Sequence, residues 1–343
     1  MGIGSRSGMH MAFVDEFKIY GLECLCHFAF DVTRDAHDDS ILLFCDNDAL
    51  LLQGVSMVIG WYPGHMNKAR KEIIHALKKV HAVLEVVDAR LPYSSENPLL
   101  HELAGDKPGL KILNKSDLAD PELNQVWLKF YAEQGIPAMT VCGKNPGNLR
   151  QQVIRHFSTL QASTRPPFRI MVVGIPNAGK STLINVLAGR KIAKTGNEPA
   201  VTKGQQQIML DDNIAILDTP GILWPKIEDQ DSAYRLAVTG AIKNTAIEFE
   251  DIALFAIAFL KKRYPDALLT RYQLASVDEE PVQLLEEIGR RRGCLVRGGV
   301  DYTKTGEVLL SDLRSGKLGL LTLETPEDIP EPEPPAADGE ITG

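Results

Sequence analysis

The 343-residue sequence contains no uninterrupted apolar run that approaches the length needed to cross a bilayer. It holds only five cysteines, and their spacing matches neither a disulfide framework nor a metal-ligand array. These absences argue against a membrane-spanning protein, a disulfide-stapled secreted domain and a zinc-binding module. We therefore expect a soluble protein with no transmembrane segment, in a reducing, cytoplasmic setting.

The first 56 residues also lack the features of a targeting segment. No basic region is followed by an apolar core and a cleavage site, and nine acidic residues argue against an organellar transit peptide. The segment carries no recognisable site, whereas Met57 begins a stretch, MVIGWYPGHMNKARKEI, that looks like a natural start. Two interpretations stay open: a native N-terminal extension, or a start codon assigned too early.

The net charge of −8 is distributed unevenly. Residues 1–56 hold nine acidic and three basic side chains, and residues 327–343 hold six acidic and no basic ones, which leaves residues 57–326 with a net charge of +4. A mildly basic body permits a nucleic-acid partner without arguing strongly for one.

The most informative stretch is FRIMVVGIPNAGKSTLINVLA, residues 168–188. Its first six residues predict a buried strand and its last eight a helix, and the residues between them have the spacing of a phosphate-binding loop. Glycines let successive backbone N–H groups turn inward, and the helix N-terminus favours the same anion. We expect Lys180 to reach the β- and γ-phosphates and the Ser181 hydroxyl to hold Mg²⁺. The predicted nucleotide contacts in this stretch are Gly174, Asn177, Ala178, Gly179, Lys180, Ser181 and Thr182.

A second short strand, residues 110–113, ends in Asn114, Lys115, Ser116 and Asp117. This Asn-Lys-x-Asp tetrad is the guanine reader of GTP-binding domains. A carboxylate only accepts hydrogen bonds, so Asp117 can pair with the N1–H and 2-amino groups that guanine presents side by side and adenine does not. The tetrad therefore favours GTP over ATP. The loop after a strand at 136–141, Cys142-Gly143, stands where a small-residue loop backs the base, although an ordinary loop explains it equally well.

Switch residues follow the phosphate loop. Thr202, in PAVTKG, is our choice over Thr195 for the threonine that completes the Mg²⁺ shell and senses the γ-phosphate. Two predicted strands, 206–210 and 213–217, lead to Asp218-Thr219-Pro220-Gly221. We expect Asp218 to hold a Mg²⁺ water and the Gly221 N–H to meet the γ-phosphate. Ser181, Thr202 and Asp218 are thus the predicted metal-site residues.

The order of these motifs is unusual. The base-reading tetrad precedes the phosphate loop by about sixty residues, whereas an ordinary GTP-binding domain has the phosphate loop and the Asp-x-x-Gly switch first. The chain is therefore predicted to be a circular permutation, which is tolerated because all site loops lie at one edge of a parallel sheet. The predicted fold is α/β: a circularly permuted P-loop GTPase domain, with a mostly parallel sheet and helices on both faces, followed by a small α-helical domain. We expect an N-terminal extension at 1–56, the G domain at 57–225, the helical domain at 226–320 and a disordered acidic tail at 321–343.

The helical region carries basic clusters at two helix ends, Lys261-Lys262-Arg263 and Arg290-Arg291-Arg292. Favourable placement at helix C-termini and contacts to RNA phosphates explain them equally well.

Six motifs, WYPGHMNKAR, DARLPYSSENP, NKSD, GIPNAGKS, PAVTKG and DTPGI, occur in that order. Over roughly residues 57–310 the chain resembles the bacterial ribosome-biogenesis GTPases of the circularly permuted YlqF/RbgA type. The sequence departs from the family at Ala200, where Gly is usual, and at Cys142-Gly143, which replaces Ser-Ala. The resemblance implies a cytoplasmic, GTP-hydrolysing factor that binds large-subunit precursors and their rRNA in the GTP form and leaves after hydrolysis, and it favours RNA as the partner of the basic clusters.

Hydrolysis requires a group that orients water. Ile222 occupies the position where Ras-like enzymes have glutamine, and its side chain cannot hydrogen-bond water, so turnover by the protein alone should be slow. The resemblance suggests two substitutes: Asn177, which matches an asparagine associated with bound K⁺, and His65, which matches a histidine proposed to help hydrolysis on the ribosome. Lys180, Asn177 and His65 are the predicted catalytic residues.

The expected cofactors are GTP or GDP, Mg²⁺ and K⁺, and the expected oligomeric state is a monomer. Two alternatives stay open: a switch acting on tRNA or another RNA, and a signalling module whose GTP form recruits a protein effector.

Overall fold

The computed structural model describes residues 31–34, 41–44, 64–143, 145–160, 166–192, 206–224, 227, 229–242 and 248–330. The chain divides into two compact units, residues 1–57 and 58–343. In the first unit, strands β1 (Asp31–Arg34) and β2 (Ile41–Phe44) form an antiparallel pair. No helix in the described ranges is long and apolar enough to span a bilayer.

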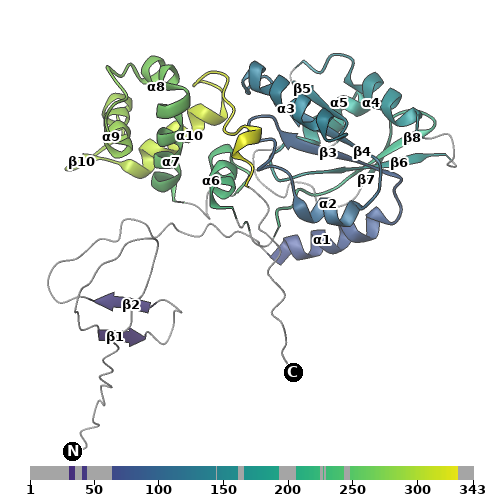
Figure 1. Cartoon of the computed structure of the whole chain (residues 1–343), viewed down its shortest axis with the longest axis horizontal. Coiled ribbons are helices and arrows are strands. Elements are labelled where there is room, and N and C mark those ends of the chain that lie inside the picture. Colours follow the sequence, from purple (N-terminus) through teal and green to yellow (C-terminus); the bar gives the residue numbers. More distant parts are fainter. Residues whose placement is uncertain are drawn as a thin grey trace, which may run out of the picture. The chain divides into compact units, whose positions relative to one another are not determined.

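The second unit begins with a six-stranded sheet and its helices (Figure 1). The sheet order is β5-β4-β3-β6-β8-β7, and every neighbouring pair is parallel except β7 and β8. The elements are α1 Gly64–Leu77, β3 Ala82–Asp88, α2 Pro98–Ala104, β4 Gly109–Asn114, α3 Pro121–Glu133, β5 Ala138–Val141, α4 Leu149–Ser158, β6 Phe168–Val173, α5 Lys180–Ala188, β7 Gln206–Met209 and β8 Ile214–Asp218.

Helices cover both faces of this sheet. Alternate residues of a strand point to opposite faces. Leu84 and its even-numbered neighbours in β3 join a cluster with apolar residues of α4 and α5. Val83 packs with α1 and α2 on the opposite face, where Val87 packs with α3. The predicted fold class, with a mostly parallel sheet between helices, is confirmed.

A helical bundle follows the sheet. Its helices α7, α9 and α10 pack against one another, and α6 contacts both α7 and α10. Three helices were not predicted from the sequence: α10 here, and α2 and α3 beside the sheet. The elements are α6 Gln230–Thr239, α7 Phe249–Arg263, α8 Pro265–Tyr272, α9 Pro281–Arg292, β9 Leu295–Val296, β10 Gly299–Val300 and α10 Tyr302–Arg314.

The C-terminal segment from Leu318 to the 3-10 helix η3 (Pro326–Asp328) lies between the bundle and the sheet (Figure 1). Leu321 and Leu323 are buried, and their N–H groups donate to the carbonyls of Leu118 (3.0 Å) and Arg90 (2.7 Å). The prediction of a disordered tail is therefore wrong for residues 321–330, because alternating apolar side chains anchor this segment in the core. The rest of the predicted tail lies outside the described residues.

Candidate nucleotide-binding site

The phosphate-loop sequence forms the connection between β6 and α5. Gly174 has φ 144° and Gly179 has φ 96°, values that L side chains rarely adopt. A Cβ on Gly179 would lie 2.1 Å from the Asn114 side-chain nitrogen. The loop therefore requires glycine here for its turn and for the close approach of Asn114.

Asn114, the last residue of β4, connects the base-reading tetrad to this loop. Its Nδ2 donates to the carbonyl of Ala178 at 2.8 Å. Gly143, in the loop after β5, lies beside Asn114 and the start of α5. A Cβ on Gly143 would be 3.4 Å from the Thr182 methyl and 3.9 Å from Asn114 Oδ1. The structure thus brings together three sequence-predicted segments that are far apart in the chain, and their contacts with a base stay predictions.

The neighbouring strand contributes a buried ion cluster that the site prediction did not include. Asp88, the last residue of β3, accepts a hydrogen bond from Lys115 Nζ at 2.8 Å and is paired with Arg90 at 2.7 Å. Asp88 lies at a strand's carboxyl end, where open α/β sheets bind ligands, and in the sequence it begins the motif DARLPYSSENP. The pairing with Lys115 was not visible there, because it depends on the parallel register of β3 and β4.

Lys180 and the end of β8 meet at the mouth of the phosphate loop. Lys180 Nζ donates to the carbonyls of Gly174 (2.9 Å) and Ile175 (2.7 Å). A Cβ on Gly221 would lie 2.7 Å from that same Nζ, so the Asp-x-x-Gly segment approaches the loop as closely as a glycine allows. Asp218 is 3% exposed, and its Oδ1 has no hydrogen-bond partner among the residues that the structure describes.

Burial shifts both charged groups in this part of the site. It raises the pKa of Asp218 to about 6, although Lys180 and the Thr219 N–H oppose the change. It lowers the pKa of Lys180 to about 8, although Asp218 opposes that change. Each group therefore lacks enough opposite charge or hydrogen-bonding partners to offset its desolvation.

These residues fit a Mg²⁺-bound nucleotide. Mg²⁺ is usually held by one or two protein oxygens together with phosphate and water, not by an all-protein cage. Among the described residues, the Asp218 Oδ1 atom has no hydrogen-bond partner, and no three His, Cys, Asp or Glu side chains form a cluster placed for a metal. Ser181 opens α5 at the same loop, whereas Thr202 lies outside the described residues.

Asn177 makes a contact that the sequence did not reveal. Its φ is 59°, and its Nδ2 donates to the carbonyl of Gly240, the residue that ends α6, at 2.6 Å. Arg314 of α10 donates to the Val238 and Ala237 carbonyls at the same helix end. The phosphate loop is therefore bonded directly to the helical bundle, and the predicted catalytic and K⁺-binding roles of Asn177 stay untested predictions.

Two further residues bear on hydrolysis. Ile222 is fully buried in the cluster formed with α1 and α2, and its carbonyl accepts a hydrogen bond from Asn97 at 3.0 Å. Its side chain is thus directed into the core and cannot orient water. His65 falls within the bounds of α1, but its side chain lies outside the described part of the structure.

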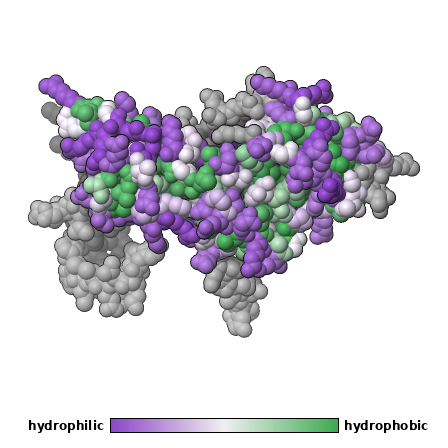
Figure 2. Space-filling view, turned by 90° about the horizontal axis from the view of Figure 1, so that it is seen from above, coloured by the Kyte–Doolittle hydropathy of each residue, from purple (hydrophilic) through white to green (hydrophobic). Residues whose placement is uncertain are grey.

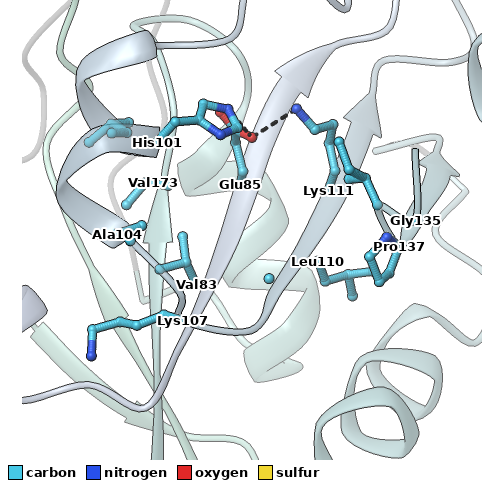
Figure 3. A pocket seen from close by; sticks show the side chains of 14 residues that line it. Val83, Glu85, His101, Ala104, Lys107, Leu110, Lys111, Gly135, Pro137 and Val173 are labelled. Atoms are coloured by element: carbon cyan, nitrogen blue, oxygen red, sulfur yellow. Dashed lines mark ion pairs between the residues drawn. The ribbon is translucent and has the colours of Figure 1, made fainter. Parts of the chain in front are cut away.

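A pocket of about 240 Å³ lies elsewhere, over β3 and β4 between α2 and the turn that precedes β5 (Figure 3). Figure 3 shows Lys111 facing Glu85 across its floor, at 3.0 Å. Lys111 also pairs with Glu96, and His101 bridges the two glutamates. None of the sequence-predicted site residues lines this pocket.

Most of the basic-cluster side chains contact protein groups. Lys261 donates to two backbone carbonyls. Arg290 and Arg291 pair with glutamates one turn earlier in α9, and Arg292 pairs with Asp312. Lys262 and Arg263, at the end of α7, are exposed and form no ion pair with any residue that the structure describes, so they are the better candidates for an external anion.

Comparisons with known proteins agree with this geometry. Residues 169–292 match the family model described as "50S ribosome-binding GTPase". A protein of Priestia megaterium named "Ribosome biogenesis GTPase A" is 46% identical over 287 residues, which cover 80% of this chain and 100% of that protein. A mouse protein named "Mitochondrial ribosome-associated GTPase 1" is 34% identical, over 78% of this chain and 90% of that one.

Solved structures give the same result. The crystal structure of GNP-bound YlqF from T. maritima aligns with a TM-score of 0.57 at 30% identity, over 76% of this chain and 100% of that chain.

Proposed function

This chain belongs to the ribosome biogenesis GTPase A family, and from that premise we propose that it assembles the large ribosomal subunit, binding precursor particles in its GTP form and leaving after hydrolysis. The chain is a GTPase, as its family and its matching domain indicate. The large subunit is favoured because the matching family model is described as binding the 50S particle.

The observation that carries the nucleotide proposal is the 2.8 Å hydrogen bond from Asn114 to the Ala178 carbonyl. It joins the base-reading tetrad to the phosphate loop across the permuted order. We propose that Asp117 and Lys115 recognise guanine, that Cys142 and Gly143 back the base, and that loop N–H groups with Lys180 hold the phosphates. Asp218, Ser181 and Thr202 would hold Mg²⁺, which supplies positive charge to the phosphate oxygens.

We propose that the isolated protein hydrolyses GTP slowly. The buried Ile222 side chain offers no hydrogen bond to an attacking water. His65 and Asn177, together with K⁺, are the proposed substitutes when the particle is bound. In this proposal Asn177 keeps its orientation through the bond to Gly240.

We propose that the helical bundle contacts rRNA through the exposed end of α7. Figure 2 shows that hydrophilic side chains predominate over the bundle, which lies at the left of the view. Lys262 and Arg263 lie at that helix end, where cations also suit the helix dipole. Arg290, Arg291 and Arg292 pair with acidic residues of the protein, which leaves less positive charge for RNA and favours the alternative of a protein effector. The test must therefore distinguish an RNA partner from a protein partner.

The test is GTP hydrolysis in K⁺ buffer, with and without purified large ribosomal subunits. Strong stimulation supports both the partner and a site that is completed on the ribosome. Two matched variants then identify the surface involved. Lys262→Gln removes a charge from the helical bundle, and the control Lys129→Gln removes an exposed charge from α3, where Lys129 lies 3.7 Å from Glu133. If RNA is the partner, only the first variant weakens subunit binding and lowers its salt dependence. GTP binding without any stimulation by subunits would favour the effector alternative.

A further inference from the structure

We propose that Asp88 and Arg90 are positioning residues for guanine recognition, which act by fixing the side chain of Lys115. The inference rests on the proposed GTP-binding role of the tetrad that contains Lys115. Nothing in the tetrad alone explains how a lysine with four rotatable bonds is held in one direction before a nucleotide arrives.

The backbone brings the two segments together at one point. Asp88 and Asn114 are partners in the parallel register of β3 and β4, and the Ala89 N–H donates to the Asn114 carbonyl at 2.8 Å. Lys115 follows with φ 61°, a left-handed conformation that is uncommon for a residue with a side chain. This turn places Lys115 beside Asp88, although 27 residues separate the two in sequence.

The Asp88 carboxylate is a fully occupied anchor. One oxygen accepts from Lys115 Nζ at 2.8 Å and from Arg90 Nη2 at 2.7 Å. The other accepts from Arg90 Nε at 2.9 Å and from the Arg90 N–H at 3.1 Å. Burial alone would raise the pKa of Asp88, but Arg90 and Lys115 outweigh it and hold the pKa well below its usual range. The carboxylate is therefore charged whenever the protein is folded near neutral pH.

Arg90 holds this anchor from the other side. Both side chains of the pair are almost completely buried, at 2% and 3% exposed. The Arg90 carbonyl accepts the Leu323 N–H, and the Asp88 N–H donates to Ser95 Oγ at 3.0 Å. The C-terminal segment and the turn after β3 thus fix the backbone on which the carboxylate stands.

The arrangement exceeds what packing alone requires. One arginine already neutralises Asp88 in a bidentate pair, and a second cation on the same carboxylate leaves the cluster with a net positive charge. Lys115 keeps 24% of its side chain exposed. Fixing this side chain in advance removes the entropy loss that nucleotide binding would otherwise impose.

The test measures dissociation of a fluorescent GDP analogue chased by excess GDP, together with the thermal midpoint without nucleotide. The variants are Asp88→Asn, Lys115→Met and the two combined. Since charge-assisted hydrogen bonds are among the strongest in proteins, we expect Asp88→Asn to speed dissociation by about tenfold. In the Lys115→Met background the same change should alter the rate by less than about twofold, because the two residues act through one interaction.

Asp312→Asn is the matched control. Asp312 is 4% exposed and also pairs with several cations, Arg271, Arg292 and Lys317, but it lies in the helical bundle. Its loss should lower the thermal midpoint without changing the dissociation rate. Asp88→Asn leaves Arg90 buried without a carboxylate, and this can prevent folding. In that case the double variant Asp88→Asn/Arg90→Met, which removes both buried charges, takes the place of Asp88→Asn in the test.

Two results would overturn the inference: an equal acceleration in both backgrounds, or a dissociation rate that stays unchanged while the midpoint falls as it does for Asp312→Asn. A wild-type chain that binds no GDP analogue would instead refute the proposed nucleotide function, and this inference with it.

Discussion

Replacing Glu324 with glutamine should make the protein's stability less dependent on pH. Glu324 is 1% exposed, and it accepts hydrogen bonds from the Tyr93 N–H (2.6 Å), the Ser94 N–H (3.0 Å) and the Ser94 hydroxyl. Arg235 Nη1 lies 3.6 Å from the Glu324 carboxylate. Burial raises the pKa of Glu324 from 4.5 to about 7, because these donors and Arg235 do not offset the cost of burying the charge.

The sign of the effect follows from proton binding. Between pH 4.5 and 7 the folded protein holds a proton on Glu324 that the unfolded chain has released, so rising pH favours unfolding. Each tenfold difference in proton affinity corresponds to about 1.4 kcal/mol. The free energy of unfolding of the wild type should therefore fall by about 2 to 3 kcal/mol from pH 5 to pH 8 relative to Glu324→Gln.

Urea denaturation of both proteins at pH 5, 6, 7 and 8 measures this difference. Other titrating groups, such as Asp88, contribute equally to both proteins and cancel. The amide oxygen of glutamine can still accept the Tyr93 and Ser94 N–H groups, so the variant should fold. A difference in unfolding free energy that stays constant over this pH range would refute the reasoning, because it would mean that Glu324 is charged throughout.

Three further variants test other parts of the structure. Asp117→Asn should weaken GTP binding by roughly 10- to 100-fold and improve XTP binding, measured by competition with a fluorescent GDP analogue. The two N–H donors of guanine lose their carboxylate acceptor, whereas the asparagine NH₂ group can donate a hydrogen bond to xanthine. Lys111→Met should lower the free energy of unfolding by about 3 to 5 kcal/mol in urea, because it leaves the buried Glu85 carboxylate with only the half-exposed His101 beside it. His65→Ala should spare GTP binding and reduce subunit-stimulated turnover, and unchanged stimulated turnover would remove His65 from the mechanism.

The sequence predicted the elements with strong local signals. The strands that end in Asn114, Val173 and Asp218 lie within one residue of their predicted ends, because each is a short apolar run followed by polar or glycine residues. The permuted order also predicted that the tetrad and the phosphate loop share one sheet edge, and the Asn114 contact confirms that they adjoin.

Other features depend on contacts that no local pattern encodes. Helix α10 was missed because Gly306 interrupts its helical pattern, and glycine is unfavourable within helices. In the structure a Cβ on Gly306 would lie 2.5 Å from the Phe249 carbonyl, so close packing against α7 requires the glycine. Glu324 was wrongly predicted to be exposed, because an acidic residue near a Pro- and Glu-rich tail normally is. It is buried instead, since it bonds to Tyr93 and Ser94, which lie more than 200 residues away in the sequence.

Long-range contacts also connect the helical region to the nucleotide site, which it follows directly in the permuted chain. Two of the contacts between the helical region and the nucleotide-binding domain lie next to the site: Asn177 of the phosphate loop bonds to Gly240, and the C-terminal segment bonds to the carbonyls of Leu118 and Arg90 near the base-reading tetrad. A further contact joins the start of α6 to the turn after β3, where the Ser232 and Ser94 hydroxyls lie 2.9 Å apart. The C-terminal attachment uses backbone next to strand ends of the sheet, and we expect it to stay the same with GDP or GTP. The Asn177 contact belongs to the loop that would surround the phosphates, and α6 follows directly after the Asp218–Gly221 segment. We therefore expect a change at the γ-phosphate to act first on the Gly240 end of α6, because the start of that helix and the base side of the site are held by separate contacts.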